Sequence, residues 1–71
     1  MRATRDMTGK MIVWQERDDE ASEWEPEQRA VIDRVANGDI AINEGSEKFP
    51  RIQWLGVNDE SEIYLRVVSV E

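Results

Sequence analysis

Apolar residues occur in short stretches separated by polar and charged segments. The first stretch, residues 10–17 (KMIVWQER), places Ile12, Val13 and Trp14 together between Gly9 and a run of acidic residues. Adjacent β-branched and aromatic residues of this kind are typical of a strand. The sequence therefore predicts a strand at residues 10–17.

Residues 26–36 have the apolar spacing of a helix. Pro26 is well tolerated at the first position of a helix, acidic residues around it favour the helix N-terminus, and Gly38 suits a left-handed cap after the last turn. The apolar positions, which recur at spacings of three and four, are Ala30, Val31, Ile32, Val35 and Ala36. The pattern predicts a helix over residues 26–36.

Residues 39–48 allow two interpretations. Residues 40–42 (IAI) form a short strand in the first, which ends at residues 43–45 (NEG). In the second, a tight helix-to-helix turn leads into a short helix that ends before Pro50. Gly45 would weaken that helix by about 1 kcal/mol relative to alanine, which favours the strand or an irregular segment.

Two stretches near the C-terminus, residues 51–57 and 62–70, are rich in β-branched and aromatic residues and flank the polar residues 58–61. This arrangement predicts a β-hairpin with a four-residue turn. In the second arm Ile63, Leu65 and Val67 share one face and alternate with polar residues and Tyr64, as in a strand with one buried side.

These elements predict an α+β fold, β-α-β-β in order, in which one helix packs on a small antiparallel sheet with a C-terminal hairpin. Trp14 and Trp54, within predicted strands, are expected in the core. A chain of 71 residues forms one domain, here residues 10–71, and residues 1–9 are expected to be a disordered leader. A core of this size without disulfides makes self-association or a partner a reasonable source of stability.

The residue inventory argues against catalysis. The chain contains no histidine and no cysteine, which removes the imidazole base, the thiolate nucleophile and the usual zinc ligands. No serine lies in a nucleophile-elbow motif, and a calcium loop starting at Asp18 would need glycine in place of Glu23 and glutamate in place of Arg29. Paired carboxylates could do acid and base chemistry only in a cleft, which a core this small hardly forms. We therefore expect a non-enzymatic protein without a cofactor or a metal.

The net charge of −7 argues against direct binding to nucleic acid and to anionic membranes. The longest run of consecutive apolar residues near the N-terminus, residues 11–14, is too short for a signal peptide or a membrane span. Because absence of cysteine also fits a reducing compartment, the sequence predicts a cytoplasmic protein.

Acidity is concentrated in residues 16–27 (ERDDEASEWEPE), where seven acids face Arg17 alone, a net charge of −6. Such a cluster accelerates association with a positive surface and can occupy sites that otherwise hold phosphates. Trp24 within it has the form of an interface anchor, although it could instead cover the start of the predicted helix. The predicted partner-binding residues are Asp18, Asp19, Glu20, Glu23, Trp24 and Glu25.

The sequence thus favours a protein-binding module, an inhibitor or modulator that occludes a basic and potentially nucleic-acid-binding surface of a partner protein. It is similar, in size and charge only, to small acidic phage and plasmid proteins that block host nucleases or defence complexes. The alternative is a structural or assembly subunit that self-associates, for example as a homodimer, through the edge of its hairpin. A small enzyme is the weakest interpretation.

Overall fold

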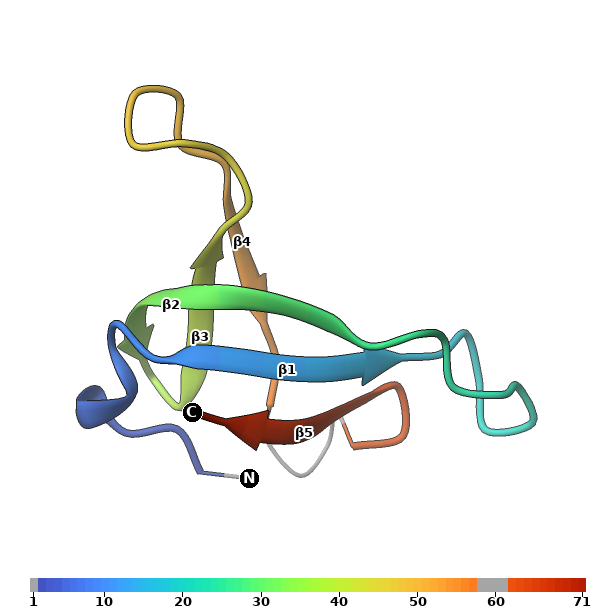
Figure 1. The fold of residues 1–71 in the computed structure, drawn as a ribbon. Helices are drawn as coiled ribbons and strands as arrows, with labels where there is room; N and C mark the ends of the chain where they lie inside the picture. The colour runs from blue at the N-terminus through green and yellow to red at the C-terminus, as the bar shows by residue number, and fades with distance from the viewer. Residues whose placement is uncertain (1, 58–61) are drawn as a thin grey trace.

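Five strands form one antiparallel sheet in the computed structural model, which describes residues 2–57 and 62–71 (Figure 1). The sheet order is β4-β3-β2-β1-β5, so the last strand lies beside the first. A short 3-10 helix, η1, precedes the sheet at Arg5–Met7. The strands are β1 (Met11–Glu16), β2 (Gln28–Ala36), β3 (Asp39–Asn43), β4 (Ile52–Leu55) and β5 (Leu65–Val70).

The predicted helix at residues 26–36 is wrong, and with it the α+β class. This segment is β2, which pairs with β1 on one side and β3 on the other. Its β-branched residues suit a strand, and two flanking strands satisfy its backbone groups. The predicted helix cap is instead the turn between β2 and β3: Asn37 and Gly38 have positive φ values of 54° and 79°, as a tight hairpin turn requires.

The predicted C-terminal hairpin is also wrong, although both of its arms contain strands. β4 pairs with β3, and β5 pairs with β1, so the two strands lie at opposite ends of the sheet order. The turn predicted at residues 58–61 lies outside the described residues. Local sequence could indicate the strands but not their partners, because the pairing of β5 with β1 joins segments about 50 residues apart in the chain.

Two strand predictions are confirmed. The stretch at residues 10–17 is β1, and the favoured interpretation of residues 40–42 as a strand is correct, since they lie within β3. The two-residue period predicted for the second C-terminal arm holds within β5, where Leu65 is buried and Arg66 is exposed. Ile63 precedes β5 and is exposed.

One face of the bent sheet holds the core. Trp14 is 2% exposed, as predicted, but its Nε1 has no hydrogen-bond partner among the described residues. Trp54 is 49% exposed, so its predicted place in the core is wrong. It lies opposite Ala41 in the pairing of β4 with β3, and the Arg34 guanidinium is 5.7 Å from its ring centre. The other large, fully buried side chains are Ile12, Ile32, Ile40, Ile42 and Leu55.

Residues 2–9, for which the sequence predicts disorder, contact the sheet. Ala3 belongs to the buried core cluster, and Met7 packs against that cluster. The Gly9 amide donates a hydrogen bond of 2.9 Å to the carbonyl of Ile32, and the Ile32 amide donates one of 2.9 Å to the carbonyl of Lys10. The pairing of β1 with β2 is therefore extended at its N-terminal end.

Candidate partner-binding surface

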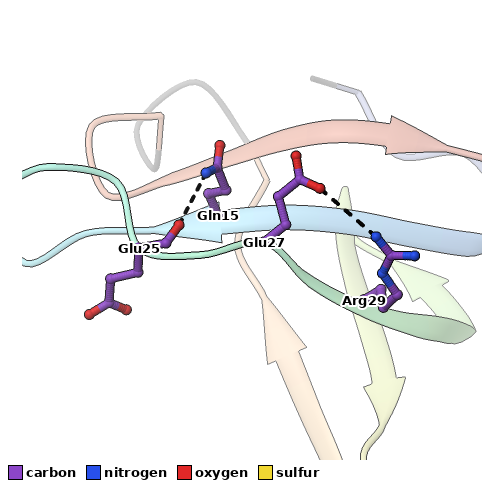
Figure 2. Close-up of polar contacts among 4 residues, drawn as sticks. All are labelled: Gln15, Glu25, Glu27 and Arg29. Carbon is purple, nitrogen blue, oxygen red and sulfur yellow. Dashed lines mark hydrogen bonds and ion pairs between the residues drawn. The ribbon is translucent and has the colours of Figure 1, made fainter.

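The acidic segment of the sequence forms the connection between β1 and β2. We call residues 17–27 the acidic loop; it extends beyond the end of the sheet, away from η1 (Figure 1). Its two ends are joined by a hydrogen bond of 2.9 Å from the Glu25 amide to the Glu16 carbonyl. Figure 2 shows the side chain of Gln15 donating a second bond, of 3.1 Å, to the carbonyl of Glu25. The base of the loop is therefore attached to β1.

A turn organised by Asp19 shapes the outer part of the loop. One oxygen of its carboxylate accepts hydrogen bonds from the amides of Ala21 and Ser22, at 2.8 and 2.9 Å, and from the Ser22 hydroxyl at 3.1 Å. Aspartate commonly stabilises turns in this way. The Asp19 carboxylate thus shapes the outer part of the loop.

Trp24 is partly buried against two arginines. The guanidinium carbons of Arg17 and Arg66 lie 4.2 and 4.5 Å from its ring centre, within the range of cation–π attraction. Both cations are held by further bonds: Arg17 Nε donates to the Ile63 carbonyl at 2.6 Å, and Arg66 Nε donates to Gln15 Oε1 at 2.8 Å. Trp24 therefore attaches the acidic loop to β5 and the segment before it.

This placement bears on the two roles considered for Trp24. The alternative in which it covers the start of a helix is wrong, because residues 26–36 form no helix. Its role as an interface anchor stays a prediction. The contacts with Arg17 and Arg66 show in addition that Trp24 supports the conformation of the loop.

Most carboxylates of the acidic loop have no counter-charge within the part of the chain that is described. The side chains of Asp18, Glu20, Glu23 and Glu25 are exposed and make no hydrogen bond or ion pair with described residues. At the ends of the segment, Glu27 lies 3.9 Å from Arg29 (Figure 2), and Glu16 accepts a bond of 3.0 Å from Gln28.

The arginines beside Trp24 reduce the local negative charge without cancelling it. The seven acids of residues 16–27 against Arg17, Arg66 and Arg29, the last of which pairs with Glu27, leave a net charge of −4. Arg17 and Arg66 already hold the loop in place, since each bonds an oxygen and contacts Trp24. The loop therefore presents an uncompensated excess of carboxylates to solvent.

Beside the base of the acidic loop lies a groove of about 390 Å³, which we call the seam groove. Glu16, Asp18 and Glu25 line one part of it, and Trp54 and Tyr64, the latter 52% exposed, supply aromatic surface. Its other lining residues are Arg17, Gln53, Leu55, Gly56 and Leu65.

Part of this surface was predictable from the sequence. All six predicted binding residues lie in the acidic loop, but of these only Asp18 and Glu25 also line the seam groove. Tyr64 could have been included, because its position opposite the Leu65 face already indicated an outward side chain. Trp54 could not have been included, because only the pairing of β4 with β3 places it at the groove.

Two further observations concern metal ions and membranes. Within residues 2–57 and 62–71, no three side chains of the kinds that ligate metals are grouped so as to hold an ion. The described part of the chain also contains no helix of the length and apolarity that crossing a membrane would require.

Comparison with known proteins gives no match: no family model fits the chain, and no curated protein or solved structure is significantly similar to it.

Proposed function

We propose that the protein is a non-enzymatic, cytoplasmic binding module that uses its acidic loop to occlude a basic surface of a partner protein. The observation that carries this proposal is the set of exposed carboxylates at Asp18, Glu20, Glu23 and Glu25 without counter-charges among the described residues. Opposite charge on a partner would speed association and orient the complex. A surface that otherwise binds phosphates of nucleic acid is the best complement, which makes an inhibitory role the favoured one.

The fixed shape of the loop supports the same proposal. Binding costs less conformational entropy when the binding element is already ordered. Contacts of Trp24 with Arg17 and Arg66, together with the turn at Asp19, order the loop without using its other carboxylates. The charges can therefore meet a partner as a pre-arranged group.

The test is affinity capture from the native host with the partner identified by mass spectrometry, using two variants of equal charge. The loop variant neutralises four loop acids: Asp18→Asn, Glu20→Gln, Glu23→Gln and Glu25→Gln. The control variant neutralises four exposed acids elsewhere: Asp33→Asn, Glu44→Gln, Glu47→Gln and Glu71→Gln. Asp19 is left intact in both because it organises the turn.

We expect the wild type and the control variant to capture the same basic protein, and the loop variant to lose it. Equal loss in both variants would assign the effect to total charge. Retention by the loop variant would show that the acidic loop is not the binding surface. Either of these two results overturns the proposal.

A second candidate function, self-association as a structural subunit, is favoured by exposed apolar residues at the β4 end of the sheet. Phe49 is 74% exposed, and Ile52 and Trp54 are exposed on β4 itself. Edge strands of this kind can pair with a second copy. Light scattering across a concentration series distinguishes the candidates: a stable dimer dissociated by Ile52→Lys supports self-association, and a monomer at high micromolar concentration excludes it.

A further inference from the structure

The two edges of the sheet, β4 and β5, approach each other at the seam groove. Four consecutive residues at the β4 edge, 53–56, line one side of this groove, and Tyr64 and Leu65, at the start of β5, line another. Among the described residues β4 pairs only with β3, and β5 pairs only with β1. The groove therefore lies beside both edge strands of the sheet.

The edge of β4 is chemically suited to accept such a strand. In an antiparallel edge strand, alternate residues direct their N–H and C=O groups away from the neighbouring strand, where they are available for pairing. Protected edges usually carry lysine, proline or a bulge. β4 (IQWL) has no such residue, and its pairing with β3 has no register shift.

The edge of β5 differs on each of these points. Its pairing with β1 contains a register shift between Val13 and Trp14, and Arg66 places a cation on the strand. Arg66 is also engaged with Trp24 and Gln15. Of the two edges, β4 is thus the one open to strand addition.

Charge and aromatic surface specify what the added strand should carry. Glu16, Asp18 and Glu25 line the groove. The one cation among its described lining residues is Arg17, whose Nε already donates to the Ile63 carbonyl. Tyr64 and Trp54, the latter beside Arg34, are about half exposed and offer aromatic surface on which an arginine or lysine side chain of a partner can lie. An extended segment with arginine or lysine at some positions would complement the outward-facing backbone groups of β4, the carboxylates and the rings together.

We propose that the seam groove binds an extended, basic segment of the partner protein, which adds to β4 as an antiparallel or parallel strand. This inference rests on the proposed function and specifies the element of the partner that is recognised. Strand addition to a sheet edge is a common mode of peptide recognition in which backbone bonds give affinity and side-chain pockets give specificity. A second copy of this chain is a poorer occupant, since each copy carries a net charge of −7.

The test begins with selection of random peptides, displayed on phage, on the immobilised wild-type protein. We expect enrichment of peptides that contain several arginine or lysine residues among β-branched ones and that lack proline in the binding segment. The most enriched peptide is then synthesised and its affinity measured by fluorescence anisotropy. Enrichment of proline-rich peptides, or no enrichment over a blank surface, would overturn strand addition at this groove.

Two matched variants place the peptide on β4. Trp54→Lys puts a cation into the groove and should weaken binding at least about tenfold, since it removes an aromatic contact and repels a basic peptide. Val31→Lys makes the same kind of change at an exposed apolar residue of β2, away from the β4 edge and the groove, and should leave affinity within about threefold. Equal effects of the two variants would contradict the inference. Circular dichroism of both variants checks that the sheet is retained.

Two chemical changes test the mode of binding independently. Two peptides are compared, each N-methylated at every second amide, one at the odd and the other at the even positions. Only one of these two sets of amides pairs with β4, so only one of the two methylated peptides should lose binding. Asp18→Asn with Glu25→Gln should weaken binding and reduce its dependence on salt. Unchanged binding of both methylated peptides would exclude strand addition.

Failure of this inference can be told apart from failure of the proposed function. Glu20 and Glu23 belong to the acidic loop but do not line the seam groove. If Glu20→Gln with Glu23→Gln abolishes capture of the natural partner while Trp54→Lys does not, the groove inference fails and the proposed function stands. If capture of the partner is unaffected by salt and by the loop variant, the proposed function itself fails.

Discussion

The guanidinium carbon of Arg17 lies 4.2 Å from the centre of the Trp24 ring, although both residues belong to the most acidic segment of the chain. An arginine within such a segment would be expected to pair with a neighbouring carboxylate. Here it stacks on an indole and donates to the Ile63 carbonyl instead. The consequence is that Arg17 and Trp24 help to order the loop while the carboxylates of Asp18, Glu20, Glu23 and Glu25 stay exposed.

The contribution of Trp24 can be measured by a double-mutant cycle with Arg66. We expect Trp24→Leu and Arg66→Ala to show a coupling of about 0.5–1 kcal/mol in the free energy of unfolding, as for a partly exposed cation–π contact. The control cycle pairs Trp24→Leu with Arg29→Ala, since Arg29 contacts no ring in the described structure. Coupling of the same size in both cycles would contradict the contact.

The core position of Trp14 and the surface position of Trp54 predict very different mutational costs. Trp14→Ala should lower the free energy of unfolding by about 3–5 kcal/mol, because it leaves a cavity under the sheet. That amount is comparable with the whole stability of a domain of this size, so the variant should be largely unfolded. Trp54→Ala should cost about 1 kcal/mol or less, since half of the ring is already in water. Chemical denaturation measures both, and similar costs would contradict the placement of these residues.

Gly45 lies in a turn that has no room for a side chain. A Cβ at this position would meet the carbonyl oxygen of Phe49 and come within 2.8 Å of the Arg51 amide nitrogen, both of them backbone atoms. We expect Gly45→Ala to destabilise the protein by about 1–3 kcal/mol, as overpacking does elsewhere. The exposed Glu47→Ala in the same turn should change stability by about 0.5 kcal/mol or less. A neutral Gly45→Ala would show that this turn has another shape.

The N-terminal segment can be tested through the titration of Asp6. The Thr4 hydroxyl, and then the amide of Asp6 itself, donate to this carboxylate and lower the pKa of Asp6 below its ordinary value. Since the folded pKa is the depressed one, the stabilising contribution is fully present at neutral pH and is lost as the pH falls through the folded pKa. NMR titration should find the lowered pKa, and Thr4→Val should raise it. An ordinary pKa in both proteins would indicate a disordered leader.

The sequence predicted a strand at β1 and favoured one at β3, but it predicted a helix at β2, where the spacing of the apolar residues fits both structures. The β2 residues Ala30, Val31 and Val35 fit a helical face as well as a strand. The dipeptide Asn37-Gly38 was interpreted as a helix end, but it favours a two-residue hairpin turn at least as strongly and so could have indicated a strand. Pairing with strands on both sides then determined the outcome.

The candidate site also has one part that the sequence predicts and one part that it does not. The acidic loop was predictable, because its charges are consecutive in the chain. The seam groove was not predictable, because it is lined by Trp54 from β4 and by Tyr64 at the start of β5. No local sequence pattern shows that these strands are the two edges of one sheet. The stacking of Trp24 on Arg66 likewise joins segments that only the fold brings together.

The most direct test of the central claim is the salt dependence of partner affinity for the wild type and for the variant with neutral side chains at Asp18, Glu20, Glu23 and Glu25. Exposed charges interact over a Debye length that shrinks from about 30 Å at 0.01 M salt to about 8 Å at 0.15 M. We predict that wild-type affinity falls at least about tenfold over this range, whereas the variant binds weakly and changes little. Equal affinities and equal salt slopes for the two proteins would contradict a binding role for the acidic loop.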